Sequence, residues 1–358
     1  MEKKDKQENS FIAHSRPTLG PEEMKAVSDV IASGHIAEGG VVREFERTFK
    51  KRMSVGYASA TSSGTAALHL ALLALEIGPA DEVIIPSYVC TALLNAVRFV
   101  GATPVLADIN PGSYNIDPGD VRKRVTSRTK AIIVPHLFGM VADLKNLLKL
   151  NLPIIEDCAQ SVGASFNRQL CGSFGHMAVF SFYATKVLTC GEGGMVVSNS
   201  KGLADTISDL KSYDQKGVDK IRFSYKMTDF QAAMGLTQLT RLNSFLERRR
   251  MIAQEYRKAF ETLNLKLPPD DPGHIYYRFV IELNQDSGDW IQKILKKGIG
   301  AARPVYLPLH QHLNRNGYAV TEAAWRQSIS IPIYPSLNPQ EVNRVIETLT
   351  DLFNDNGM

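Results

Sequence analysis

Short apolar runs alternate with helical patterns over residues 55–200. Five of these runs are rich in β-branched residues and have the length of a strand: 83–85, 103–106, 131–134, 153–155 and 178–180. Helical patterns lie between them, at 66–75, 92–100 and 142–150. Continuous apolar strands that alternate with helices are typical of a mostly parallel sheet covered on both faces. Ligands of such sheets bind at the carboxyl ends of the strands, where the polar residues of this region fall.

Helical patterns also flank this region. Pro21 follows Gly20 and precedes two acids, which predicts a helix start, and Gly34 predicts its end. A long helix is predicted over 229–260, with the charged run 247–250 on a solvated face. After a proline-rich break, the pattern indicates a smaller α/β unit. We therefore expect a disordered tail over 1–10, a large domain over 11–240 and a small C-terminal domain over 241–358.

Composition and charge narrow the class of protein. The chain is 44% hydrophobic and 22% charged, which is ordinary for a folded enzyme. Its net charge is +4, and its lysines and arginines alternate with acids and do not form a basic stripe. This pattern does not favour nucleic-acid binding. No apolar run has the length of a membrane span, and four cysteines without Cys-x-x-Cys spacing are typical of free thiols in a reducing compartment. We expect a cytoplasmic protein with no membrane partner and no metal.

The first chemical signal is a run of small residues leading into a helix. Ser63, Gly64 and Thr65 stand there. Glycine lets a ligand approach the backbone, and free N–H groups at a helix start favour a bound phosphate. Helix capping by the hydroxyls explains the same residues, and this motif alone favours capping.

The second signal is a pair of acids directly after a predicted strand, Glu156 and Asp157. An acid in a desolvated cleft needs a partner. A pyridinium nitrogen is one such partner, because a neighbouring carboxylate keeps the ring protonated and able to accept electrons. A surface-loop acid is the plainer alternative. Of the pair, Glu156 is expected to point elsewhere.

The third signal follows the strand at 178–180. Ser181 offers a hydroxyl for a phosphate, and Lys186 stands five residues later among small and apolar residues. A lysine in such a place becomes a nucleophile towards carbonyls. A solvated lysine is the usual fate of that residue type. The glycine-rich run 191–194 permits a tight turn into the next strand.

Each signal is weak alone, but their order and spacing resemble the fold-type I pyridoxal-phosphate enzymes. More narrowly, the chain resembles the DegT/DnrJ/EryC1/StrS aminotransferases from about Arg16 to Leu349. The matching motifs include Ser-Gly-Thr-Ala-Ala at 63–67, Asp-Cys-Ala-Gln at 157–160 and Gly-Glu-Gly-Gly at 191–194. The resemblance implies an aspartate aminotransferase-like α/β fold with a mostly parallel seven-stranded sheet and a smaller C-terminal α/β domain. It also implies a homodimer with its active site at the interface.

The same resemblance implies roles for individual residues. Lys186 forms the Schiff base with pyridoxal 5'-phosphate and later moves a proton between substrate and cofactor. Asp157 pairs with the pyridine nitrogen, and Gln160 lies against the ring or its hydroxyl. The phosphate side of the cofactor is held by Ser63, Gly64, Thr65 and Ser181. Some relatives carry histidine in place of the lysine and remove a sugar hydroxyl, and Lys186 argues against that branch.

Two positions depart from the family pattern. Most relatives place an aromatic residue over the cofactor ring where this chain has Cys90, so either Tyr88 stacks on the ring or the ring packs on the thiol of Cys90. Many relatives also lend an asparagine to the phosphate of the neighbouring subunit. Ser224 stands there, so that contact is weaker or Lys226 compensates.

The sequence says less about the residues that bind the substrate than about those that bind the cofactor. Arg303 and His310 stand where relatives build the mouth of the substrate site. Arg303 is a candidate partner for a donor carboxylate or a sugar diphosphate. A surface arginine explains it equally well.

The resemblance implies a function: transfer of an amino group, commonly from glutamate, to a keto sugar, with ping-pong kinetics. We expect a nucleotide-linked sugar in a polysaccharide or secondary-metabolite pathway, with cyclitol or non-nucleotide substrates left open. One alternative is a dehydratase or lyase on the same scaffold. Another is a catalytically silent regulator, which the set of Asp157, Ser181 and Lys186 disfavours.

Overall fold

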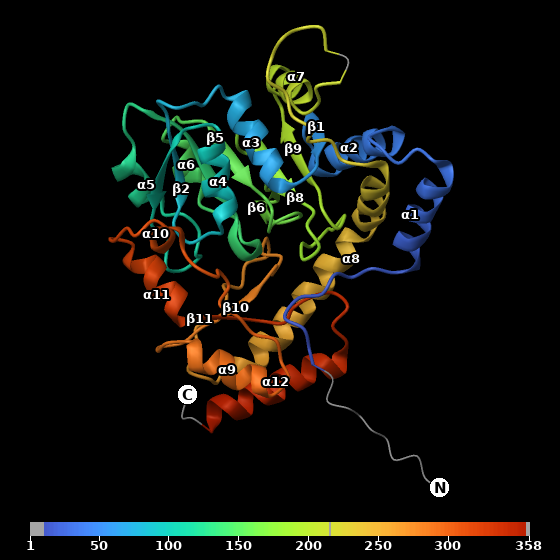
Figure 1. Ribbon diagram of the computed structural model, residues 1–358. Helices are drawn as coiled ribbons and strands as arrows, with labels where there is room; N and C mark the ends of the chain where they lie inside the picture. The colour runs from blue at the N-terminus through green and yellow to red at the C-terminus, as the bar shows by residue number, and fades with distance from the viewer. Residues whose placement is uncertain (1–10, 215, 356–358) are drawn as a thin grey trace.

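A seven-stranded sheet forms the centre of the computed structural model, which describes residues 11–214 and 216–355 (Figure 1). The strand order is β1-β9-β8-β5-β4-β2-β3. Its strands are β1 (Tyr57–Thr61), β2 (Glu82–Pro86), β3 (Thr103–Ala107), β4 (Thr129–Pro135), β5 (Ile154–Asp157), β8 (Met177–Ser181) and β9 (Gly194–Ser198). Only β9 runs against its neighbours in this sheet. The predicted mostly parallel α/β sheet is confirmed, and the expected tail over 1–10 lies outside the described residues.

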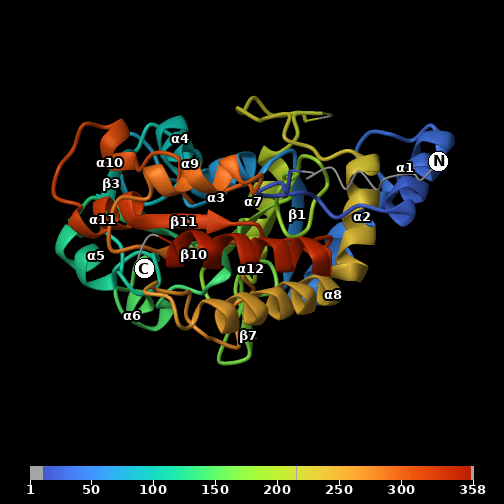
Figure 2. The same cartoon turned by 90° about the horizontal axis from the view of Figure 1, so that it is seen from below.

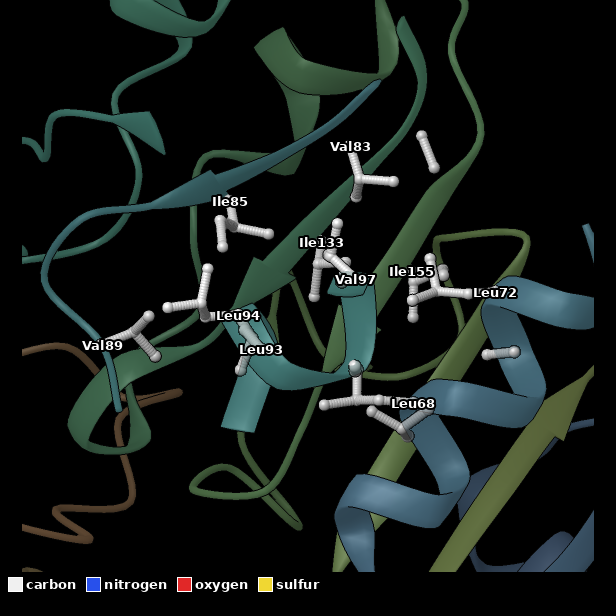
Figure 3. Packing of buried hydrophobic residues seen from close by; sticks show 14 of the residues in the cluster. Leu68, Leu72, Val83, Ile85, Val89, Leu93, Leu94, Val97, Ile133 and Ile155 are labelled. Carbon is white, nitrogen blue, oxygen red and sulfur yellow. The ribbon is translucent and has the colours of Figure 1, made fainter. Parts of the chain in front are cut away.

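Both faces of the sheet are covered, which explains why the strands are continuously apolar. Along β4, Ile133 packs on one face and Ile132 on the other, because successive side chains of a strand alternate. Figure 3 shows the first face, where side chains of α3 (Gly64–Ala74) and α4 (Thr91–Phe99) meet those of the strands. On the other side, α2 (Gly40–Met53) packs Phe45 and Phe49 against Phe180 and Phe182.

Smaller elements complete this part of the chain. They are α5 (Pro118–Arg124), η1 (Leu137–Gly139), α6 (Leu144–Leu148), the hairpin of β6 (Ser165–Phe166) and β7 (Gln169–Leu170), and α7 (Lys201–Leu210). The predicted helix at 142–150 is therefore shorter than expected. Asp143 caps it by accepting a hydrogen bond from the N–H of Asn146, so the helix begins only at Leu144.

Two helices have the bounds that the sequence predicts. The helix α1 (Pro21–Ser33) ends at Gly34 in the left-handed region, and α8 spans Asp229–Phe260. The expectation of a solvated face at 247–250 is wrong for Arg249. That side chain is buried, and its Nη1 donates to the carbonyl oxygens of Tyr276, Tyr277 and Ile333. Hydrogen bonds to the backbone replace the water that a guanidinium normally keeps.

The C-terminal part forms a second layer below the large sheet (Figure 1). Two antiparallel strands, β10 (Phe279–Glu282) and β11 (Ser328–Ile331), lie beside α9 (Gly288–Lys296) and α12 (Pro339–Asn354) (Figure 2). The short helix α10 (Leu309–His312) and α11 (Ala319–Gln327) precede β11. A separate apolar core joins β10, β11, α9 and α12 to the C-terminal half of α8, whereas α10 and α11 pack on the core of the large sheet. Because α8 runs unbroken through residue 240, a domain boundary there stays a prediction.

Within the described residues, none of the helices combines the length and the apolar character needed to cross a bilayer. The loops that follow the parallel strands of the large sheet, together with the start of α3, build the cavity described next.

Candidate active site

A cavity of about 260 Å³ opens at the carboxyl ends of the central strands. It is lined by residues from the loops after β1, β2, β4, β5 and β8. Most of the residues singled out in the sequence meet in it, namely Ser63, Gly64, Thr65, Cys90, Asp157, Gln160, Ser181 and Lys186. These residues are up to 123 positions apart along the chain, from Ser63 to Lys186, and the parallel topology brings them to one edge of the sheet.

One end of the cavity is the first turn of α3. Ser63 caps this helix, because its Oγ accepts a hydrogen bond from the N–H of Ala66 at 3.1 Å. The N–H groups of Gly64 and Thr65 stand in the first turn, where a helix offers them no internal acceptor. Capping and anion binding are therefore compatible at this helix start, since the cap uses a different N–H group.

Gly64 lets this turn lie directly on the end of β8. A Cβ atom on Gly64 would stand 2.8 Å from Cβ of Ser181. Gly194 allows the same closeness from the other side, because a Cβ atom on it would overlap the carbonyl oxygen of Ser63. Ser181 and Gly194 are paired across β8 and β9, so the turn rests on the ends of two adjacent strands. The predicted tight turn into a strand ends at Gly194, where β9 begins.

Asp157 ends β5 at the wall of the cavity and is buried. Its Oδ1 accepts a hydrogen bond from the N–H of Ala159 at 2.9 Å. Burial raises the pKa of this carboxyl, and the hydrogen bond and the charge of Lys186 offset only part of that effect. A cationic N–H group placed beside Asp157 would stabilise its ionised form.

Glu156 points away from the cavity, as the sequence predicts. Burial alone would raise the pKa of Glu156, but hydrogen bonds from His136 and from the N–H groups of Gly172 and Gly175 lower it. The Glu156 carboxylate therefore stays ionised and ties β5 to the loop before β8. The two adjacent acids therefore differ in role, because Glu156 holds the loop before β8 and Asp157 faces the cavity.

His136 is a cavity residue to which the sequence reading gave no role. Its Nδ1 accepts a hydrogen bond from the N–H of Ala142, so the proton resides on Nε2, which donates to Glu156 at 2.9 Å. Together with Cys158, these two side chains present ligand atoms within 4.8 Å of one another. Both ring nitrogens are already hydrogen-bonded, so we assign the group to the framework behind Asp157 rather than to a metal. The available signal was its position directly after the apolar strand β4.

Lys186 extends into the cavity from the turn after β8. Its backbone N–H donates to the carbonyl of Tyr183 at 2.9 Å, which fixes the turn. The Nζ atom lies 5.3 Å from the centroid of the Tyr277 ring. In the part of the chain that the structure describes, no carboxylate forms an ion pair with Lys186. The amine therefore lies near Asp157 and the face of the Tyr277 ring, and among the described residues no ion pair holds it.

Tyr277 was also missed by the sequence reading, because it belongs to an aromatic run just before β10 that is typical of buried core. Burial alone would raise the pKa of its phenol. The charges of Lys186 and Arg278 outweigh burial and, with a hydrogen bond from Thr185, lower the pKa of Tyr277 to about 8. The C-terminal layer thus contributes a polarised side chain next to Lys186.

Tyr88 does not line the cavity. It is fully buried, with its ring centroid 6.0 Å from that of Tyr114 and 6.2 Å from that of Phe138. Cys90 stands at the start of α4 and does line the cavity, next to Val89. Of the two residues considered for the face of the ring, only Cys90 is placed to meet a ligand in this cavity.

Ser224 and Lys226 also lie outside the lining of this cavity. Ser224 is exposed, and the adjacent Tyr225 accepts a hydrogen bond from the N–H of Ser62 through its carbonyl oxygen at 2.8 Å. The ammonium of Lys226 is paired with Asp214. The segment therefore passes close to the start of α3 while presenting Ser224 outward.

His310 and Arg303 are separated from the cavity and from each other. His310 is buried, with Nδ1 2.8 Å from Oγ of Ser87 and Nε2 3.2 Å from a carboxylate oxygen of Glu322. It fixes the C-terminal layer to the loop after β2. Arg303 lines a different cavity, where it donates to Asp286 at 3.1 Å.

Comparison with known proteins gives a consistent result. Residues 17–350 match the model of the DegT/DnrJ/EryC1/StrS aminotransferase family. GDP-perosamine synthase of Escherichia coli O157:H7 is 33% identical, covering 96% of this chain and 99% of that protein. The spore coat polysaccharide biosynthesis protein SpsC of Bacillus subtilis is 34% identical, with 96% and 97% coverage. Among solved structures, Spr1654 of Streptococcus pneumoniae in its PMP form has a TM-score of 0.91 at 27% identity, covering 96% of this chain and 98% of that one.

Proposed function

The chain belongs to the DegT/DnrJ/EryC1/StrS aminotransferase family, and on this basis we propose that it aminates a keto sugar linked to a nucleoside diphosphate. The observation that carries the proposal is the convergence of Lys186, Asp157 and the start of α3 in one cavity. A nucleophilic amine, a buried acid and an anion site are the three groups that pyridoxal-phosphate chemistry requires of a protein.

The cofactor is pyridoxal 5'-phosphate, in keeping with the family and with the PLP and PMP forms of Spr1654. The residues of the cavity fit it. The close contact of Gly64 with Ser181 leaves a cradle in which the N–H groups of α3 and the Ser181 hydroxyl bind a phosphate. The carboxyl of Asp157, whose pKa burial raises, gains a cationic partner in the ring nitrogen. When bound, the cofactor withdraws electrons from the carbon that loses or gains a proton.

Each remaining role follows from a contact. Asp157 holds the proton at the ring nitrogen. The Oε1 atom of Gln160 accepts a hydrogen bond from the N–H of Phe138 at 2.9 Å, which leaves its amide N–H groups to donate to the ring oxygen. Lys186 takes the proton from the substrate carbon on its Nζ and returns it, because this amine has no ion-pair partner among the described residues. Cys90 and Val89 provide the apolar contact next to the ring.

The substrate proposal rests on the relatives. One relative is named for making GDP-perosamine, a sugar carried on a nucleoside diphosphate, and another for polysaccharide biosynthesis. We propose glutamate as the amino donor and a polysaccharide or secondary-metabolite pathway as the setting. We further propose a homodimer in which the exposed Ser224 of one subunit meets the phosphate site of the other. The free thiols Cys90, Cys158, Cys171 and Cys190 support a cytoplasmic location.

The experiment that tests this function follows both half-reactions. The loaded enzyme is mixed with glutamate alone, and the absorption spectrum of the cofactor is recorded. We expect complete conversion to the aminated form, followed by recovery when a keto sugar nucleotide is added. A panel of such sugars linked to guanosine, uridine and thymidine diphosphates identifies the acceptor. If no amino acid produces the aminated cofactor, the chain is not an aminotransferase, and the dehydratase or lyase and the silent regulator are the alternatives that stand.

A further inference from the structure

Phe138 has a strained backbone beside the cofactor cavity. It is the middle residue of η1, the turn after β4, and has φ 58° and ψ 12°, in the left-handed region. Glycine adopts this conformation readily, whereas a bulky aromatic residue does so rarely. Strained backbone persists only where the surrounding structure determines it, and it gathers at functional sites. The N–H and the carbonyl of Phe138 are therefore candidates for a functional contact.

These two groups are hydrogen-bonded to different parts of the molecule. The N–H donates to Oε1 of Gln160, which lines the cofactor cavity, at 2.9 Å. The carbonyl oxygen accepts from Nε2 of His274 at 3.2 Å and from the N–H of Arg278 at 3.4 Å. Both of these donors belong to the segment that leads into β10. Phe138 thus joins the cofactor cavity to the C-terminal layer through its backbone.

The segment before β10 lies against η1 with no side chain between the two backbones. The N–H of Ile275 donates to the carbonyl of Gly139 at 3.1 Å. A Cβ atom on Gly139 would stand 2.6 Å from Cγ1 of Ile275 and 2.9 Å from the backbone nitrogen of Tyr277. Gly139 has φ 94°, which glycine adopts at little cost. Because the contact is this close, a shift of the segment before β10 displaces the carbonyl of Phe138.

His274 is buried and is held in one orientation. Its ring stacks on that of Tyr276, with 4.0 Å between the centroids and 29° between the planes. Burial lowers the pKa of His274 more than hydrogen bonds to the carbonyls of Phe138 and Pro269 raise it, so the ring is neutral. A carbonyl oxygen only accepts, and Nε2 lies closer to its carbonyl than Nδ1 does, at 3.2 Å against 3.5 Å. The single proton therefore resides on Nε2 and points at Phe138.

The large sheet holds η1 from the other side. The N–H of Leu137 donates to Oδ1 of Asn115 at 2.8 Å. The ring of Phe138 packs edge-on against that of Tyr114, with 5.5 Å between the centroids and 70° between the planes. Tyr114 is itself in the left-handed region, with φ 61°. Because η1 is held from both sides, the N–H of Phe138 has one direction, toward Gln160.

We propose that His274 and Phe138 are positioning residues for Gln160. His274 holds the backbone of Phe138, whose N–H fixes Oε1 of Gln160 and so directs the amide N–H groups of Gln160 at the cofactor ring. The inference rests on the proposed function and extends it to two residues that do not line the cavity. The competing explanation is a structural role, in which His274 stabilises the fold without acting on Gln160.

A double-mutant cycle on the Kd of pyridoxal phosphate separates the two explanations. His274→Phe keeps a ring on Tyr276 and loses the donor, and Gln160→Ala removes the amide. We expect each single variant to raise the Kd by about threefold to tenfold, because each loses one hydrogen bond. The double variant should bind as Gln160→Ala does, since His274 then has no side chain to position. If the two single effects multiply in the double variant, His274 acts independently of Gln160 and the proposal is overturned.

Two further variants serve as controls for this cycle. His274→Gln can still donate to the carbonyl of Phe138, so its Kd should stay close to that of the wild type. Gln254→Ala removes an exposed amide that donates to Asp270 in the same part of the chain, and it should leave the Kd unchanged. Equal weakening in His274→Gln and His274→Phe would mean that the donated hydrogen bond is not what matters, which also overturns the proposal.

The absorption band of the bound cofactor gives a second readout, because a donor at the ring oxygen changes the electron distribution of the ring. We expect Gln160→Ala and His274→Phe to shift the band in the same direction, and the double variant to add no further shift. Lower stability of His274→Phe with an unshifted band would establish the structural role and overturn the inference, while the aminotransferase function stands. A wild-type protein that binds no pyridoxal phosphate would refute the proposed function itself.

Discussion

The Cβ atom that Gly64 lacks would stand 2.8 Å from Cβ of Ser181, so the first turn of α3 lies directly on the end of β8. We expect Gly64→Ala to lower the affinity for pyridoxal phosphate by about tenfold, because the helix start must move away from Ser181 and widen the phosphate cradle. Equilibrium titration of the cofactor-free protein measures this. Gly78→Ala is the matched control, since nothing lies within 4 Å of its Cβ position. Equal affinities for pyridoxal phosphate in both variants would show that the first turn of α3 does not bind the phosphate.

We expect Asp157 to affect the rate of the glutamate half-reaction more than the affinity for the cofactor. Asp157→Asn keeps the shape of the side chain and loses the charge that holds a proton at the ring nitrogen. We expect the single-turnover rate of the glutamate half-reaction to fall by roughly a hundredfold or more, while the cofactor still binds. Asp157→Glu retains the charge and serves as the comparison. A half-reaction of normal rate in the asparagine variant would show that this carboxylate does not act on the ring.

Tyr277 gives a pH signature that can be measured without substrate. Lys186, Arg278 and Arg249 face its phenol, and its pKa of about 8 lies below the ordinary value of 10. Since the pKa is lower in the folded state, the phenolate stabilises the fold fully above pH 10, and this contribution is lost as the pH falls through 8. In the cofactor-free protein, ultraviolet titration should show one tyrosine ionising near pH 8 that is absent from Tyr277→Phe. The free energy of unfolding of the wild type should rise relative to the variant between pH 8 and 10, by on the order of 1–2 kcal/mol. A flat difference across this range would contradict the assignment.

Arg249 is expected to be the most sensitive charged residue of α8. Arg249→Ala leaves the carbonyl oxygens of Tyr276, Tyr277 and Ile333 without their donor and opens a cavity in the core. We expect the free energy of unfolding to fall by about 3 kcal/mol or more. Arg250→Ala, which removes a half-buried neighbour with one backbone acceptor, should cost less than about 1 kcal/mol. Urea denaturation of the two variants compares them.

The sheet and its helices follow from the sequence because the pattern of apolar residues reports burial directly. Ile132 and Ile133 are both buried, and only a sheet covered on both faces accounts for that. The same reasoning fails at Arg249, since a run of charges does not reveal that one member turns inward to backbone carbonyls. Long-range hydrogen bonds of this kind have no local signature.

The cofactor cavity was also largely predictable, because its residues follow successive parallel strands. Lys186 and Asp157 share one cavity, as their positions after β8 and β5 imply. His136 escaped assignment although it occupies the equivalent position after β4. Tyr277 and Arg278 were missed for another reason, because they come from the C-terminal layer. How that layer sits over the large sheet depends on tertiary packing that no stretch of sequence specifies.

Reduction of the loaded enzyme with borohydride, followed by peptide mapping, tests whether Lys186 carries the cofactor. We expect one modified peptide, with the reduced cofactor on Lys186, and no modified peptide in Lys186→Ala. Lys211 is a useful internal control, because it is buried and is paired with Glu38 and Glu46. Modification of Lys211, or of no lysine at all in protein that binds the cofactor, would show that Lys186 does not hold it.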